Sequence, residues 1–239
     1  RTAKTLSSLR RRAGKIRDMD VLTAHAANIK HTHDENYCSV ALLEYLGARR
    51  LKQARKFHAA VRRHGSKLRN RLKRISKDIE QLLPDSKSGG NVHSPASNAN
   101  AAAWKLISEL AKASRVGRTN LHSYRLKVKE LRNLLQMADN GGDEFAKELG
   151  ELKDAIGEWH DWEELIAIAE EILDHGPKCE LTRELKSTRD KKYKNAISLF
   201  EGTRNKYLRH FDQRRGTDLP RAIKKPAESV LFATAAIAA

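Results

Sequence analysis

The chain has 239 residues, with 47 Lys or Arg against 30 Asp or Glu, and its formal net charge of +17 favours a polyanionic partner such as nucleic acid, an acidic membrane surface or inorganic polyphosphate. Aromatic residues make up 5% and charged residues 32%, a composition that favours helices packed through aliphatic stripes over any β architecture. No run of about 18 apolar residues predicts a membrane span, and Cys38 and Cys179 are too few for a disulfide framework or a cysteine-based zinc site.

The first part of the chain predicts two short helices. Residues 2–12 form the end of a helix that closes at Gly14, and residues 19–30 form the next, with Asp18 as its N-cap or first-turn acid. The turn at residues 31–36, HTHDEN, contains histidines and acids. Its spacing matches none of the well-defined zinc patterns, so a polar turn is expected and no metal site is predicted. The histidines and acids concerned are His25, His31, His33, Asp34 and Glu35.

Residues 37–83 contain no proline and predict one long helix or two stacked ones. Apolar residues recur there at intervals of three to four and predict a buried stripe. The stripe consists of Phe57, Val61, Leu68, Leu72, Ile75 and Ile79. Arg50 has the same helical phase, so its guanidinium needs an anion or an acidic partner. Residues 84–100 are rich in Ser, Asn, Gly and Pro and predict a flexible linker between two halves.

The second half predicts further helices. A short one begins at residue 101 and ends near Gly117, and Thr119 or Asn120 caps the next, which stops at residues 140–142. Residues 143–155 form another helix, and a turn at Gly157 separates it from a helix that ends near residue 173. Residues 180–214 predict a second long basic helix. Residues 219–239 begin with a proline-containing turn and end in a helix that packs on the rest.

The most informative stretch is LHSYRLKVKELRNLL, residues 121–135. His122, Arg125, Lys129 and Arg132 fall within an arc of roughly 80° on a helix. Apolar side chains occupy the opposite arc. They are Leu121, Tyr124, Val128, Leu131, Leu134 and Leu135. Such a helix buries one side and presents a narrow file of cations on the other, which suits a linear polyanion, although a solvated basic face explains many Lys/Arg-rich helices.

The two halves resemble one another. AGKIRDMDVLTAHA, from Ala13, superposes without gaps on IGEWHDWEELIAIA, from Ile156, with an offset of 143; RRLKQA, from Arg49, superposes on KKYKNA with an offset of 142. Two blocks about thirty residues apart that agree within one residue indicate an internal duplication. The domains predicted are a first helical repeat at 1–83, the linker at 84–100 and a second repeat at 101–239. The counterpart of His122 falls before Arg1, so we expect the first-half His/Arg helix upstream.

These motifs resemble the CHAD family, named for conserved histidines in an α-helical domain. AGKIRDMDVL is similar to the family's first-half G-x-x-R-D-x-D-V element, and LHSYRLKVKELRNLL is similar to its H-x-x-R-x-x-x-K-x-x-R helix. IGEWHDWEEL resembles the element that follows that helix. The resemblance implies an all-α fold of two pseudo-twofold-related helical bundles around a basic groove or pore, together forming one CHAD domain that binds inorganic polyphosphate.

By motif position, the resemblance assigns five anion ligands: His122, Arg125, Lys129, Arg132 and Arg17. The duplication and the helical phase add four more: Arg50, Arg62, Lys192 and Arg204. Asp18, Asp20 and Asp161 are expected to be caps or partners of nearby arginines and not ligands.

We therefore expect a polyphosphate-binding module without catalytic activity, for which phosphate or sulfate could substitute in crystals. No cofactor, metal or catalytic residue is predicted. The alternative is a helical protein that binds duplex DNA or RNA through the same basic faces; the scarcity of exposed aromatic residues argues mildly against single strands. A hydrolase or metalloenzyme is a third reading. An intracellular protein is expected, cytoplasmic or associated with polyphosphate granules, and its oligomeric state stays open.

Overall fold

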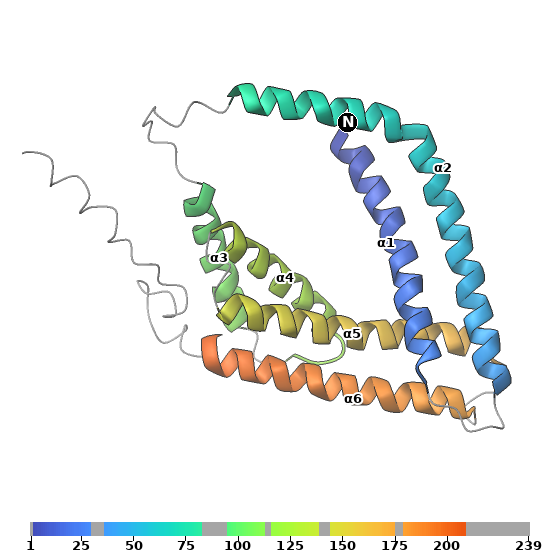
Figure 1. Cartoon of the computed structure of the whole chain (residues 1–239). Coiled ribbons are helices and arrows are strands. Elements are labelled where there is room, and N and C mark those ends of the chain that lie inside the picture. The colour runs from blue at the N-terminus through green and yellow to red at the C-terminus, as the bar shows by residue number, and fades with distance from the viewer. Residues whose placement is uncertain are drawn as a thin grey trace, which may run out of the picture. The chain divides into compact units, whose positions relative to one another are not determined.

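The computed structural model describes residues 2–29, 36–82, 95–112, 116–138, 144–174 and 179–208. These residues form six α-helices and one π-helical turn and include no strand, which confirms the all-α prediction (Figure 1). The helices are α1 (Thr2–Ala27), α2 (Asn36–Leu82), α3 (Pro95–Ala111), α4 (Leu121–Met137), α5 (Glu144–Ile172) and α6 (Glu180–Thr203), and the π-helical turn is η2 (Arg204–Leu208).

The chain divides into two compact units. Unit 1 combines residues 1–91 with residues 160–191, and unit 2 combines residues 92–159 with the rest of the chain from residue 192. The boundary therefore falls within both α5 and α6, each of which contributes a segment to either unit. The duplication and the groove inferred from sequence stay predictions.

Unit 1 has its core where α1 and α2 pack against the second part of α5 and the first part of α6. Fully buried leucines hold this core, among them Leu22 on α1, Leu42 on α2 and Leu165 on α5. The ring of Trp162 stacks on His25 at a centroid distance of 4.7 Å. Cys38 and Cys179 are buried in the same cluster and form no disulfide.

Unit 2 has a separate core built from α3, α4, the first part of α5 and the end of α6. Aromatic contacts connect its elements: Tyr124 meets Phe200 edge-on at 5.0 Å, and Phe145 packs on Tyr207 at 4.4 Å. Phe145 is completely buried. These rings add to a core that otherwise consists mainly of aliphatic side chains.

Two glycines predicted to break helices lie inside them. α1 runs unbroken through Gly14, and α5 runs unbroken through Gly157. Asp18 is consequently an interior residue of α1, so its prediction as an N-cap was wrong. A glycine in a helix interior costs only about 1 kcal/mol relative to alanine, which tertiary packing readily offsets, and no proline reinforces either glycine as a stop.

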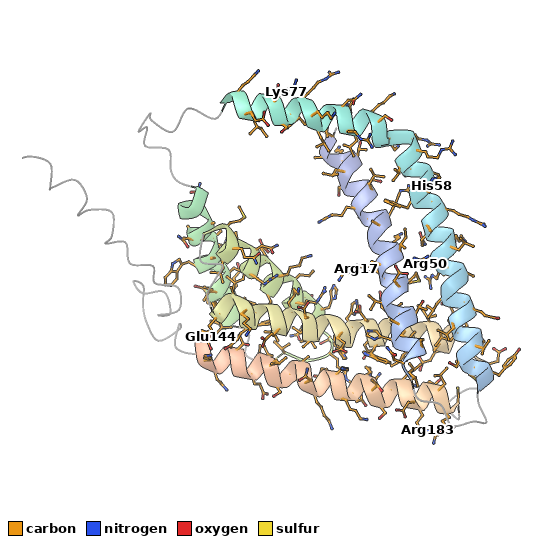
Figure 2. The ribbon with its side chains drawn as sticks, viewed as in Figure 1. Arg17, Arg50, His58, Lys77, Glu144 and Arg183 are labelled. Atoms are coloured by element: carbon orange, nitrogen blue, oxygen red, sulfur yellow. The ribbon has the colours of Figure 1, made fainter. Side chains whose placement is uncertain are left out.

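The stripe predicted to be buried along α2 is largely exposed. Val61, Leu72, Ile75 and Ile79 are 38 to 53% exposed, and Phe57 and Leu68 are half-buried. The reason is length, because α1 has 26 residues and α2 has 47. Figure 1 shows α2 bent partway along its length, beyond His58, which Figure 2 labels. Gly65 and Ser66 follow His58 in the sequence, and a Gly/Ser pair is a common cause of helix bends.

Other helix boundaries differ from the predicted ones by a few residues. α3 begins at Pro95, inside the segment predicted to be a linker, because proline suits the first turn of a helix. Asn120 occupies the N-cap position of α4, but its side-chain oxygen accepts a hydrogen bond from the Gly117 amide, at 2.7 Å. The histidine-containing turn at residues 31–35 and the helix predicted within 219–239 lie outside the described residues.

Candidate polyanion-binding site

α4 has the two faces that the sequence predicts. Five apolar residues on one side are buried, and they are Leu121, Tyr124, Val128, Leu131 and Leu135; Leu134 beside them is half-buried. On the other side His122 and Lys129 are exposed, whereas Arg125 and Arg132 are half-buried. The file of cations therefore consists of two kinds of side chain, two that extend into solvent and two that lie against the neighbouring helix.

Arg125 lies across Gly157 of α5. Its Nε–H donates a hydrogen bond to the backbone oxygen of Lys153, at 3.2 Å. A Cβ atom at position 157 would stand only 3.0 Å from Nη2 and 3.1 Å from Nε of Arg125. A Cβ there would make the guanidinium shift by a few tenths of an ångström. The bond to Lys153 uses one of the five N–H donors of the arginine, so the fork is held by the protein while keeping donors for an anion.

Arg132 has the same relation to Gly150. A Cβ atom at position 150 would stand 3.3 Å from Nε of Arg132. The two arginines are seven residues apart on α4, and the two glycines are seven residues apart on α5, so one contact repeats along the helix pair. Sequence reasoning missed both glycines as part of the site. The signal that could have found them is this shared spacing of seven residues.

Two further predicted ligands lie on or just after α6 in the same unit. Lys192 forms an ion pair with Glu158, at 2.7 Å, so a carboxylate already compensates its charge. Arg204 begins η2 and acts electrostatically on Tyr124. Burial raises the pKa of the Tyr124 phenol, and the charge of Arg204 opposes that rise. Arg204 thus lies near α4, whereas Lys192 is engaged by α5.

The remaining predicted ligands, Arg17, Arg50 and Arg62, belong to unit 1. Figure 2 labels Arg17 on α1 and Arg50 on α2. Arg50 donates from Nε to the carboxylate of Asp20, and this hydrogen bond raises the pKa of the guanidinium. The prediction that Asp20 pairs with a nearby arginine is confirmed, and so is the acidic partner that the position of Arg50 requires. Arg17 and Arg62 are exposed on α1 and α2.

Several cations outside the predicted set already have carboxylate partners in unit 2. Lys206 contacts Glu148 at 2.6 Å and Glu144 at 3.0 Å, and hydrogen bonds to these carboxylates and to Tyr207 raise the pKa of its ammonium. Lys127 on α4 pairs with Glu109 on α3, at 3.1 Å. Cations that the protein itself neutralises are weak candidates for an external ligand.

The part of the chain that the structure describes has neither a metal-binding group nor a membrane-spanning helix. No group of three or more His, Cys, Asp or Glu side chains there could hold a metal ion. None of the helices there combines the length and the apolar character that crossing a membrane requires.

Comparison with known proteins identifies the family. The model of the CHAD domain matches residues 1–170, which is well over half of the chain. The protein therefore belongs to the CHAD domain family, as the motifs on α1, α4 and α5 indicate, and this family is associated with polyphosphate binding. Searches of curated proteins and of solved structures found no match.

Proposed function

We propose that the protein is an inorganic polyphosphate-binding module without catalytic activity, and that the exposed face of α4 is its principal contact surface. The observation that carries the proposal is the placement of Arg125 and Arg132 across Gly157 and Gly150, with His122 and Lys129 on the same face. Family membership and the net charge of +17 support the same reading.

The chemistry of the face suits a phosphate chain. Polyphosphate carries roughly one charge per phosphate and has no base to recognise, so its binding site needs spaced cations and no stacking platform. Arginine offers a planar fork, lysine a point charge and histidine a donor that becomes cationic near phosphate. Successive phosphates of a long chain rebind at high effective concentration, so affinity should rise with chain length.

The test is the double substitution Arg125→Ala with Lys129→Ala. We expect long-chain polyphosphate to bind about tenfold more weakly, because two charge-assisted contacts are lost. The measurement is isothermal titration calorimetry at fixed ionic strength. The matched control is Lys105→Ala with Lys112→Ala, which removes the same charge from exposed positions at α3 and should change affinity by no more than about twofold. Equal losses in both variants would show that only net charge matters.

A nucleic-acid-binding role makes a different prediction in competition. At moderate salt, long polyphosphate should displace duplex DNA from the protein, whereas DNA should not displace polyphosphate. Binding of either polyanion weakens with salt through counterion release, so both directions are measured at one salt concentration. Displacement of polyphosphate by DNA would favour the nucleic-acid role.

A further inference from the structure

A cavity of about 270 Å³ opens between α1 and α2 in unit 1, and none of its lining residues belongs to the α4 face. Its walls contain three basic side chains, two hydroxyls and two apolar groups, and no acid. They are Lys4, Thr5, Ser8, Leu9 and Arg12 from α1, and Ala60 and His64 from α2. Such a set of donors without a carboxylate is suited to an anion.

The two helices that form this cavity supply no compensating charge near it. α1 has no Asp or Glu before Asp18, and α2 has none between Glu44 and Asp78. Over residues 49–77 alone, α2 carries 13 Lys and Arg. Like charges on two packed helices repel one another, and this cost is relieved if an anion lies between them.

The corresponding place in unit 2 has a different arrangement. Extended beyond the two matched blocks, the offsets of 143 and 142 pair Thr5 with Glu148 and His64 with Lys206. Glu148 and Lys206 form a 2.6 Å ion pair between α5 and η2. Ser8 likewise superposes on Glu151. At this place unit 2 therefore has carboxylates, whereas unit 1 has hydroxyls beside cationic groups.

We propose that the α1/α2 cavity is a second binding site, lined by residues other than those of the α4 face, for a phosphate-type oxyanion whose oxygens take the role that the carboxylate of Glu148 has in unit 2. Lys4 and Arg12 supply charge, and Ser8 of α1 and His64 of α2 supply hydrogen-bond donors. Because these groups come from two helices, a tetrahedral anion with several acceptor oxygens suits them better than a planar carboxylate does. The volume suits one phosphate or a diphosphate.

The decisive variant is Thr5→Glu, which gives unit 1 the carboxylate of unit 2. The full chain is titrated with pyrophosphate at constant ionic strength, and its melting temperature is recorded. A saturating concentration should raise the melting temperature of the wild type by about 3 °C. In Thr5→Glu the apparent affinity should fall about tenfold or more, because the new carboxylate occupies the site and repels the ligand.

A second variant changes the space without changing the charge. Ala60→Trp fills the cavity and should also abolish the response to pyrophosphate. A charge control uses two double variants. The first combines Lys4→Gln and Arg12→Gln, and the second combines Arg10→Gln and Arg11→Gln, whose arginines are exposed on the same helix but do not line the cavity. The first pair should lose binding and the second should keep it. Equal responses to pyrophosphate in the wild type, Thr5→Glu and Ala60→Trp would overturn the proposal.

Two further ligands identify the source of the phosphate. Orthophosphate, pyrophosphate and long-chain polyphosphate are each compared in wild type and Thr5→Glu, all with Arg125→Ala and Lys129→Ala in the background. If Thr5→Glu weakens binding of the small anions, the site binds free phosphates. If it weakens binding of the long chain alone, the site binds part of a polymer. If it weakens binding of no ligand, the proposal is rejected. The outcome is separable from the test of the α4 face, which measures a different unit.

Discussion

The α1/α2 pair of unit 1 and the α4/α5/α6 assembly of unit 2 differ in how each treats its cations and its glycines. In unit 2, Lys206, Lys192 and Lys127 each have a carboxylate partner, and the guanidinium of Arg125 covers Gly157. In unit 1, α2 carries 13 cations over residues 49–77 without an acid among them, and one of these, Arg50, pairs with Asp20 of α1. Gly14, which superposes on Gly157, has no described atom within 4 Å of its would-be Cβ.

This difference shows that total charge does not locate a binding surface. The chain owes its charge of +17 to residues in both units, but a cation whose carboxylate partner lies within 3 Å contributes little attraction for a ligand. The informative cations are those held in place by something other than an acid. Arg125, whose Nε–H donates a hydrogen bond to a backbone carbonyl, is such a residue.

The largest expected effect concerns packing. Leu149→Ala in unit 2 removes a side chain that is 1% exposed and should lower the free energy of unfolding by about 2 to 5 kcal/mol. Leu72→Ala in unit 1 removes the same atoms from a side chain that is 42% exposed and should cost less than about 1 kcal/mol. Urea unfolding followed by circular dichroism measures both. Comparable losses would mean that the far part of α2 is covered in solution.

The second comparison uses the superposed glycines. Gly157→Ala places a Cβ against Arg125 and should weaken binding of polyphosphate about fivefold, although no charge is lost. Gly14→Ala meets no described neighbour and should leave binding unchanged while it stabilises α1 by up to about 1 kcal/mol. Calorimetry and thermal unfolding on the two variants give both quantities. Full affinity in Gly157→Ala would remove Gly157 from the site.

A feature of the fold could be predicted from the sequence where it depends on residues close together in the chain. The faces of α4 follow from a helical period within 15 residues, so Tyr124, Val128 and Leu131 were correctly predicted to be buried. The same period on α2 failed for Leu72 and Ile79, because burial requires a second helix, and α1 is much the shorter of the two. Periodicity identifies the apolar face of a helix but not whether anything packs on it.

The candidate site shows the same limit, because contacts between residues far apart in the chain do not follow from a local pattern. Arg50 was predicted to need an acidic partner, and Asp20 supplies it. Gly157 was predicted to be a turn, because an isolated glycine in a helical pattern has several meanings and the sequence gives none of the distances that distinguish them. Its actual role depends on an arginine 32 residues earlier. The cavity between α1 and α2 depends in the same way on residues about 50 to 60 positions apart.

The smallest expected effect comes from replacing the carboxylates beside Lys206 in unit 2, which is the reverse of introducing a carboxylate into unit 1 with Thr5→Glu. Glu144→Gln with Glu148→Thr removes both carboxylate partners of Lys206 and makes unit 2 resemble unit 1. The protein should lose a little stability, because these pairs are partly exposed. It should also gain a second pyrophosphate response, worth about 1 to 2 °C in melting temperature beyond the wild-type shift.

Thr5→Glu provides the background that isolates this gain, because it removes the response of unit 1. A triple variant that combines it with the two unit 2 substitutions should respond to pyrophosphate, whereas Thr5→Glu alone should not. If the triple variant stays silent, a cation without its carboxylate is not sufficient to bind an oxyanion. The shape of the α1/α2 cavity, including Arg12 where unit 2 has Ala155, would then be the feature that distinguishes the two units.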